Sequence, residues 1–494
     1  MRLPRARRAH FRRASSPLVE QLPERDVCLE LSDHSVVQQS AVQFFGLQAA
    51  RDPHPQAARL CELFTKQNRS LFSLLDVRTE TYFDGNDLLL RLISGDRIGA
   101  VPLFSPTRGT PDYGLVVQPR FPWRGIGPML ADMGWRIAPT PLKLPLLRRS
   151  ERRVPPWVLS SMILVRLRAL LESLTRRFES TSAIRTAPKG RVDWHQYSQA
   201  YLPRGQFLSV PCTYPDLRDD RLLQGAIRFA LERQLRVLQT QVEHGAFVHR
   251  LIELCEHLLM RVHGVASVLP SPNTFGQWMH RPMRSGQLIE GLQAIEWTAN
   301  DRGLAGLSDL DGIPWTMPMN EFFEAFVETV LAIVARRLGA QLKVGRRRET
   351  TRAINWSPPF VGSQGSLIPD LWLEWQDTTL IADAKYKRHW QELLERTWAG
   401  VEDEVREQHR SDLFQVLAYG NLAVTKSIIA CLVFPCTAEI WKDLHRNERL
   451  IHKAQLQVGA RSLSLWLTAI PMGMSPDEVA PPIEAALRSA SYSA

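Results

Sequence analysis

The stretch IPDLWLEWQDTTLIADAKYK (368–387) decides how the C-terminal part of the chain is predicted to fold. The segments LIPDLWLE and LIADAKYK are short, apolar and strand-forming, and WQDTT between them is suited to a hairpin turn. Side chains alternate along a strand, so Asp383 and Lys385 share a face that Asp370 can meet from the partner strand. These charges are either the solvated tips of an ordinary hairpin or part of a metal site.

A metal site would explain why two carboxylates lie in apolar strands. Carboxylates a few ångströms apart repel each other and lose hydration, and a divalent cation removes that cost. Mg²⁺ suits them, because it takes oxygen ligands at roughly 2.0–2.1 Å and retains several waters. A lysine beside the cation can stabilise charge that develops on a phosphate or orient the attacking water. The tripeptide DAK (383–385) is the only acidic-x-Lys sequence in the chain, thirteen residues after a Pro-Asp.

Charge and cysteine content narrow the class of protein. The formal net charge is +10, and the excess is clustered in the N-terminal arm, in RRSERR (148–153), in RRF (176–178) and in GRRRE (345–349). Such clusters attract polyanions, so DNA is an expected partner, although a merely solvated basic surface has the same composition. Cys28, Cys61, Cys212, Cys255, Cys431 and Cys436 are scattered, which favours a reducing cytoplasm. No apolar run approaches the ~18–20 residues that a membrane span needs.

Four segments are predicted along the chain. Residues 1–17 form a basic, disordered arm, and residues 18–147 form an N-terminal module of mixed α/β structure that contains strands. Prolines in RRVPPWVLS open a mostly helical middle region (148–312), whose amphipathic pattern over 220–263 is broken near Gly245. From residue 313 onward, helix, strand, hairpin, helix and strand follow one another, which is typical of α/β folds.

This C-terminal order, with Pro369-Asp370 and Asp383-Ala384-Lys385 in the hairpin, resembles the core of the PD-(D/E)xK nuclease superfamily. The resemblance implies an α/β, restriction-endonuclease-like core that hydrolyses DNA phosphodiesters with Mg²⁺, for which Mn²⁺ can substitute. Asp370 and Asp383 would hold the metal, and Lys385 would stabilise charge or position water.

Flanking residues add to this resemblance. In many superfamily members a glutamate of the preceding helix completes the metal shell; Glu324 is the first choice here, with Glu321 and Glu328 as alternatives. Gln415 and Tyr419 lie four residues apart on one helix face and correspond to a Gln-x3-Tyr pair near the active site of several nuclease families. Lys387 is either a phosphate contact or a surface residue. The basic side chains expected to hold the DNA backbone are Arg346, Arg347 and Arg348.

Four stretches in a fixed order resemble McrC, the nuclease subunit of McrBC-type modification-dependent restriction systems: PMNEFFEAFV, IPDLWL, IADAKYK and RSDLFQVLAYG. PKGRVDW (188–194) and VPCTYPDLRDDRLLQGAIRFAL (210–231) extend the resemblance to about residues 150–435. Asp220-Arg221 stands where the usual motif of the family has Asn-Arg.

The resemblance implies a hetero-oligomer in antiviral defence, in which a AAA+ GTPase of McrB type recognises modified DNA and this subunit cuts it. The chain itself has no Gly-Lys-Ser/Thr, hence no P-loop, so no nucleotide is expected to bind to it. Two alternatives stay open. One is a stand-alone restriction or repair nuclease without a motor. The other is a non-catalytic activator or DNA-binding scaffold for a partner NTPase, against which the intact Asp370, Asp383 and Lys385 weigh.

Overall fold

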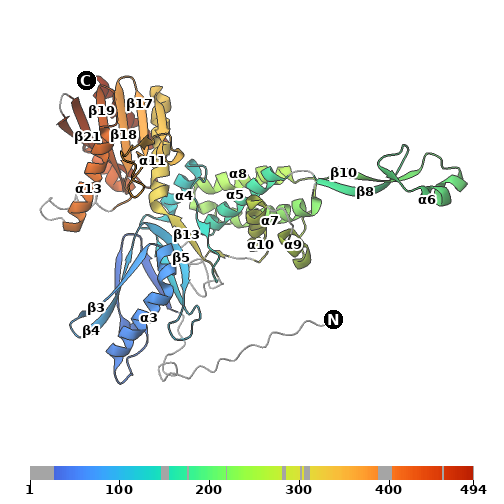
Figure 1. Ribbon diagram of the computed structural model, residues 1–494, viewed down its shortest axis with the longest axis horizontal. Helices are drawn as coiled ribbons and strands as arrows, with labels where there is room; N and C mark the ends of the chain where they lie inside the picture. Colours follow the sequence, from blue (N-terminus) through green and yellow to red (C-terminus); the bar gives the residue numbers. More distant parts are fainter. Residues whose placement is uncertain are drawn as a thin grey trace. The chain divides into compact units, whose positions relative to one another are not determined.

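The computed structural model describes residues 27–145, 155–174, 177–218, 220–280, 285–300, 303–304, 312–387, 403–458 and 461–492. The fold is mixed α/β and divides into two compact units (Figure 1). The first comprises Met1–Pro155 and Gly303–Ala494, and the second comprises Pro156–Arg302. The arm 1–17 and the RRSERR cluster lie outside the described residues. In the described part of the chain, no helix is long and apolar enough to cross a membrane.

The N-terminal part of the first unit contains two sheets. One has the order β1-β6-β5-β13-β7, and the other has the order β2-β4-β3. Helix α3 contacts β3, β4 and β5 and buries Leu60, Phe64 and Phe72 on its apolar face. The bounds are β1 (Val27–Ser32), β2 (Val36–Ser40), α2 (Ala41–Phe44), α3 (Pro53–Leu74), β3 (Val77–Asp84), β4 (Asp87–Ser94), β5 (Arg97–Leu103), β6 (Tyr113–Gln118), α4 (Trp123–Asp132) and β7 (Thr140–Pro141).

Strand β13 (Trp315–Pro318) belongs to this N-terminal sheet although it opens the segment predicted as the nuclease domain. It pairs antiparallel with β5, placing Trp315 opposite Ala100, and the Trp315 side chain is buried. Helix α11 (Met319–Leu338) follows at once, and its first residue donates from its backbone N to the Asp96 carbonyl (2.8 Å). The predicted segments 18–147 and 313–494 are therefore not separate compact units here.

The C-terminal part is built on a sheet of order β14-β17-β18-β19-β21-β20. β18, β19 and β21 are parallel neighbours, and the other pairs are antiparallel. The apolar run SIIACLVFPC forms the central strand β19, which is buried along almost its whole length. The bounds are β14 (Gln341–Val344), η4 (Gly345–Arg347), β15 (Arg352–Ala353), β16 (Ser366–Leu367), β17 (Leu371–Trp375), β18 (Thr378–Ala384), α13 (Asp403–Gly420), β19 (Ser427–Cys436), α14 (Ala438–Arg446), β20 (Ile451–Val458), β21 (Arg461–Pro471) and α15 (Pro476–Tyr492).

Two helices of this part determine what surrounds the hairpin β17–β18. Ile381 of β18 packs in one apolar cluster with Val416 and Tyr419 of α13. Side chains alternate along β18, so Leu380 and Ala382 point to the face opposite Ile381. Helix α11 contacts β14, β17 and β18. The hairpin thus contacts both α11 and α13.

The second unit is mostly helical, as predicted. Its helices are α5 (Trp157–Ser173), α7 (Arg221–Gln239), α8 (Ala246–Arg261), α9 (Pro272–Met279) and α10 (Gly286–Ala299). The predicted break falls between α7 and α8, where Gly245 has φ +124°. The prediction missed a sheet of order β8-β10-β9, which accompanies the short helix α6. Its bounds are β8 (Arg177–Arg185), β9 (Arg191–Val192), α6 (Trp194–Gln196) and β10 (Val210–Arg218).

One close backbone approach joins distant parts of the first unit. Gly125 in α4 and Gly473 after β21 are in contact, and a Cβ on Gly473 would lie 2.7 Å from the Gly125 Cα. Gly473 also has φ +101°, a conformation that side chains disfavour. Only glycine satisfies both conditions at position 473.

We expect Gly473→Ala to lower the free energy of unfolding by about 2–4 kcal/mol, because it adds a clash to a strained backbone. Gly134→Ala is the matched control, since Gly134 has φ +63° but open space around its Cβ position. That change should cost only about 1 kcal/mol. Urea unfolding of both variants compares them, and equal losses would show that the close approach is unimportant.

Candidate functional site

The carboxylates of Asp370 and Asp383 lie at the end of the hairpin opposite its turn. β17 and β18 pair antiparallel with Leu371 opposite Ala382, so continuing the register by one residue sets Asp370 opposite Asp383. Asp370 Oδ2 accepts a hydrogen bond from the Ala384 backbone N (2.9 Å), and Asp383 is 1% exposed. The turn itself falls at Gln376 and Asp377. The hairpin prediction is confirmed, and these charges are not its solvated tip.

The carboxylates repel one another in a buried setting. Burial, followed by the charges of Asp383 and Glu324, raises the pKa of Asp370 well above its usual range. Burial likewise raises the pKa of Asp383, against the opposing effect of Lys385. Glu324 on α11 has a raised pKa for the same first reason, with Arg346 acting against it. The three carboxyl groups interact electrostatically, and together they form an electronegative site that a cation would stabilise.

The donor set fits Mg²⁺ bound through two aspartates and water. Lys385 Nζ lies 2.6 Å from Asp383 Oδ2 as an ion pair, whereas Asp383 Oδ1 accepts no hydrogen bond within the described chain. A buried oxygen without a donor is suited to a metal. Among the described residues no three Asp, Glu, His or Cys side chains already form a metal cage, so Glu324 is not placed as a third ligand. Mg²⁺ commonly binds one or two carboxylates and keeps its other waters.

Lys385 connects the carboxylates to helix α13. Its Nζ contacts Asp383 and donates to Gln415 Oε1 (2.8 Å), and Gln415 Nε2 donates to the Tyr419 hydroxyl (3.0 Å). Burial lowers the pKa of Lys385, but the neighbouring carboxylates, Asp383 first, outweigh it and raise the pKa above the ordinary value. The lysine is therefore a fixed cation at neutral pH. The structure brings together Lys385, Gln415 and Tyr419, which the sequence analysis had grouped.

Lys387 is bound to a carboxylate that the sequence analysis missed. Its Nζ lies 2.8 Å from both oxygens of Asp412, a buried residue of α13. The charge of Asp412 also raises the pKa values of Asp383 and Lys385, so it belongs to the same electrostatic cluster. The signal was present in the sequence, because Asp412 lies one helical turn before Gln415.

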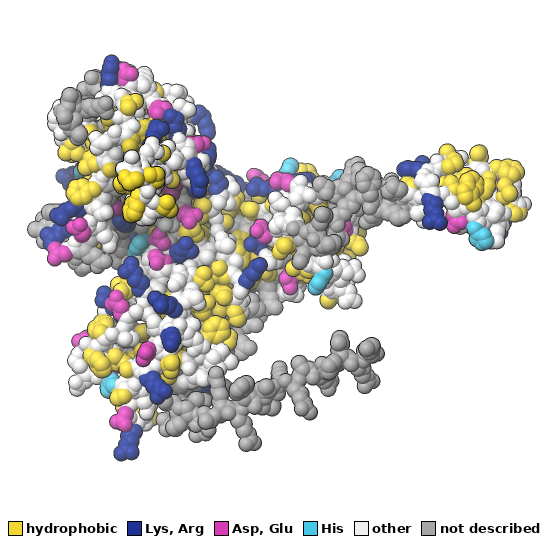
Figure 2. All heavy atoms as spheres, in the orientation of Figure 1, with side chains coloured by type: hydrophobic (Ala, Val, Ile, Leu, Met, Phe, Trp, Pro, Cys, Tyr) yellow, Lys and Arg dark blue, Asp and Glu magenta, His cyan; other side chains and the backbone are white. Residues whose placement is uncertain are grey.

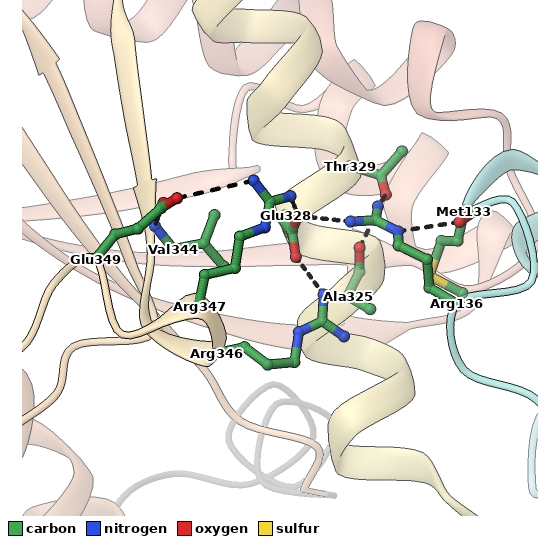
Figure 3. Close-up of polar contacts among 9 residues, drawn as sticks. All are labelled: Met133, Arg136, Ala325, Glu328, Thr329, Val344, Arg346, Arg347 and Glu349. Carbon is green, nitrogen blue, oxygen red and sulfur yellow. Dashed lines mark hydrogen bonds and ion pairs between the residues drawn. The ribbon is translucent and has the colours of Figure 1, made fainter. Parts of the chain in front are cut away.

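The three candidate glutamates of α11 have different surroundings. Glu321 is exposed, Glu324 is partly buried, and Glu328 is buried. Figure 3 shows the Glu328 carboxylate surrounded by guanidinium groups. Arg136 Nη1 lies 2.6 Å and Arg347 Nη2 2.8 Å from Glu328 Oε1, and Arg346 binds Oε2. The Glu328 carboxylate is therefore engaged in ion pairs with arginines. Glu324 is the glutamate that interacts electrostatically with Asp370 and Asp383.

A backbone contact places the basic segment GRRRE (345–349) beside Asp370. Gly345 donates from its backbone N to the Asp370 carbonyl (2.7 Å), and a Cβ there would lie 2.4 Å from the Pro369 carbonyl oxygen. Arg346, Arg347 and Arg348 follow at once and are exposed, with Arg348 at φ +61°. Arg346 and Arg347 each contact Glu328, so the predicted DNA contacts form a cluster fixed on a buried carboxylate.

The chain matches one family model and is similar to chains of solved structures. A family model described as McrBC 5-methylcytosine restriction system component matches residues 136–435. A chain of the half-complex of Thermococcus gammatolerans McrB AAA+ hexamers with bound McrC has a TM-score of 0.40 and 15% identity, over 94% of this chain and 100% of that chain. A chain of the Thermococcus gammatolerans McrBC complex has a TM-score of 0.26 and 15% identity, over 62% and 88%. No curated protein sequence matches.

We expect Mg²⁺ to raise the melting temperature of the wild-type protein by a few degrees and to leave that of Asp370→Asn unchanged. A ligand at a hundredfold excess over its dissociation constant adds about 2.7 kcal/mol of stability. The asparagine can still accept from Ala384 but cannot supply a charged ligand. Asp377→Asn, in the exposed turn, is the matched control and should keep the full shift. An unchanged Mg²⁺ effect in Asp370→Asn would contradict the metal site.

Proposed function

Because this chain belongs to the family of McrBC 5-methylcytosine restriction system components, we propose that it is the Mg²⁺-dependent DNA endonuclease of such a system. The observation that carries the proposal is the pair of the half-buried Asp370 and the buried Asp383, with Lys385 in contact. Its position at the end of an antiparallel hairpin, after helix α11 and before helix α13, supports the resemblance to the PD-(D/E)xK core.

Each residue of the site has a chemical role in this proposal. Asp370 and Asp383 would hold the metal, which supplies Lewis-acid activation of water and of the scissile phosphate. Lys385 is fixed by Asp383 and Gln415 as a cation where negative charge develops. Glu324, on the neighbouring helix, would orient a metal-bound water. Gln415 and Tyr419 hold the Lys385 ammonium in place through one continuous chain of hydrogen bonds.

The surface next to the site suits a DNA backbone. Arg346, Arg347 and Arg348 are exposed, and the loop between β15 and β16, which leads into Asp370, carries exposed Trp356 and Phe360. Arg136, Arg346 and Arg347 all contact the one carboxylate of Glu328, so their positive charges are only partly neutralised. Phosphate contacts of this kind fix position without reading sequence, and exposed aromatic rings can stack on bases.

A partner NTPase is part of the proposal. The chain has no P-loop, so a AAA+ GTPase of McrB type would supply recognition and translocation. The sheet β8-β10-β9 with its adjoining helices exposes large apolar side chains: Ile184, Trp194, Leu202, Phe207 and Leu208. Figure 2 shows apolar side chains gathered over this lobe, which contains α6. An exposed apolar patch of this size is typical of a protein-binding surface, and we assign it to the partner.

The proposed activity is tested by cleavage of methylated and unmethylated plasmid with Mg²⁺, with and without the AAA+ partner and GTP. Asp383→Ala should cut at least ~100-fold more slowly, because it removes a metal carboxylate. It should still stimulate the partner's GTPase. Asp377→Ala, in the exposed turn of the same hairpin, should cut like wild type.

Other outcomes of this experiment identify the alternatives. Robust cutting without any NTPase would indicate a stand-alone nuclease. Stimulation of the partner by a wild-type protein that never cuts would indicate a non-catalytic activator, and equal cutting by Asp383→Ala would refute the site.

For the partner surface, we expect the double variant Trp194→Ser, Phe207→Ser to weaken binding to the AAA+ partner at least ~10-fold. Large aromatic side chains contribute most to interfaces, and truncating one costs 2 kcal/mol or more, about 30-fold, at a hot spot. Biolayer interferometry gives the dissociation constants. Val424→Ser, at an 87% exposed apolar residue of the first unit, serves as the control. Unchanged affinity of the double variant would assign the patch to another partner.

A further inference from the structure

The segment that carries Lys385 leaves the sheet in a tight, hydrogen-bonded turn. The Lys385 backbone N still donates to the Val433 carbonyl of β19 (2.8 Å), and the Lys387 backbone N donates to the Lys385 carbonyl (2.9 Å). Tyr386 lies between these two lysines. Whatever fixes Tyr386 therefore fixes the backbone from which the Lys385 side chain extends towards Asp383.

Tyr386 is held by residues that come from distant parts of the chain. Its ring is buried, with ring centroids of His34, Phe121 and Phe323 within 5.6, 6.2 and 6.1 Å. Two of these residues belong to the N-terminal part and one to α11. A tyrosine enclosed in this way loses its freedom to rotate, and its hydroxyl needs a buried partner.

That partner is Asp33, which follows β1 and is 1% exposed. The Tyr386 hydroxyl donates to Asp33 Oδ2 (2.5 Å), and the Arg120 backbone N donates to Asp33 Oδ1 (2.5 Å). The Arg120 guanidinium also lies 3.9 Å from Asp33 Oδ2, so this buried carboxylate is held by two donors and one cation.

Arg120 contacts both Tyr386 and the residue that follows it. Its guanidinium lies over the Tyr386 ring (4.5 Å to the centroid), and its Nη2 donates to the Lys387 carbonyl (3.3 Å). Asp33 and Arg120 thus hold both the side chain of Tyr386 and the backbone after it. All of these groups belong to the first compact unit.

We propose that Asp33, Arg120 and Tyr386 are positioning residues for Lys385, through which the N-terminal part takes a direct share in phosphodiester cleavage. The inference rests on the proposed nuclease function. None of the three is assigned to contact DNA or metal; they act by holding the Lys385 ammonium beside Asp383. Displacements of about 1 Å in an active site can lower a rate by ~100-fold, so loss of this support has a measurable catalytic effect.

The variant that tests the inference is Tyr386→Phe, which removes one hydroxyl and keeps the ring. In the complex with the AAA+ partner, we expect the single-turnover cleavage rate at saturating DNA to fall about tenfold. The DNA dissociation constant, the Mg²⁺-induced shift in melting temperature and stimulation of the partner's GTPase should stay at wild-type values. Asp33→Asn should retain most of the rate, because its amide can accept from Arg120 and donate to the Tyr386 oxygen.

Controls separate positioning from stability. Val117→Ala, at a buried residue of β6, lowers stability and leaves the Tyr386 hydroxyl in place, and Tyr113→Phe removes a hydroxyl elsewhere in the N-terminal part. Both should cut at the wild-type rate. Full activity of Tyr386→Phe would overturn the inference, as would an equal loss in Val117→Ala at the same melting temperature.

Hydrogen–deuterium exchange gives a readout that does not depend on cleavage. The amides of Lys385 and Lys387 should exchange at least ~10-fold faster in Tyr386→Phe, while those of β19 stay protected. If wild type never cuts DNA, the nuclease proposal fails by itself, and this exchange measurement still decides whether Tyr386 anchors the turn. Unchanged exchange would overturn the positioning role.

Discussion

The pairing of the half-buried Asp370 with the buried Asp383 is the constraint on which the rest of the site depends. Two carboxylates facing each other at the ends of buried strands repel, and burial alone disfavours their charge. Lys385 neutralises one of them only in part, since Asp383 keeps an oxygen that accepts no hydrogen bond within the described chain. A fold tolerates such an arrangement where function requires it, and here α11, α13 and the η4 turn all fix the carboxylates and their neighbours.

Several contacts show that the N-terminal part packs into the same compact unit as the C-terminal part. β13 pairs with β5 before the chain enters α11, and Arg136 reaches Glu328 in the middle of that helix. Gly125 and Gly473 meet backbone to backbone. These contacts link the region before residue 155 to the helix and strands that carry the carboxylates. The same region contacts Glu328 through Arg136 and the turn after Lys385 through Arg120.

Local patterns made the hairpin, the long helix after residue 319 and the break near Gly245 predictable. Strand alternation and helical spacing are encoded within some twenty residues, so they can be read directly. The pairing of Gln415 with Tyr419 was predictable from their helical spacing, whereas their association with Lys385 came from the resemblance to nuclease families. By contrast, Arg136–Glu328 and Asp33–Tyr386 join residues 192 and 353 positions apart, and no local pattern specifies such pairs. The sheet β8-β10-β9 was missed because β10 carries Pro211 and Pro215, which argue against a central strand, although Val210, Cys212 and Tyr214 alternate and pack together.

The most direct test of the metal site is an anomalous difference map from crystals of the protein soaked in MnCl₂. A two-carboxylate site predicts one strong peak between Asp370 and Asp383, with carboxylate oxygens at about 2.0–2.2 Å. The peak should be absent from crystals of Asp370→Asn. Ordered carboxylates with no peak between them, or a peak that persists in the variant, would contradict the account.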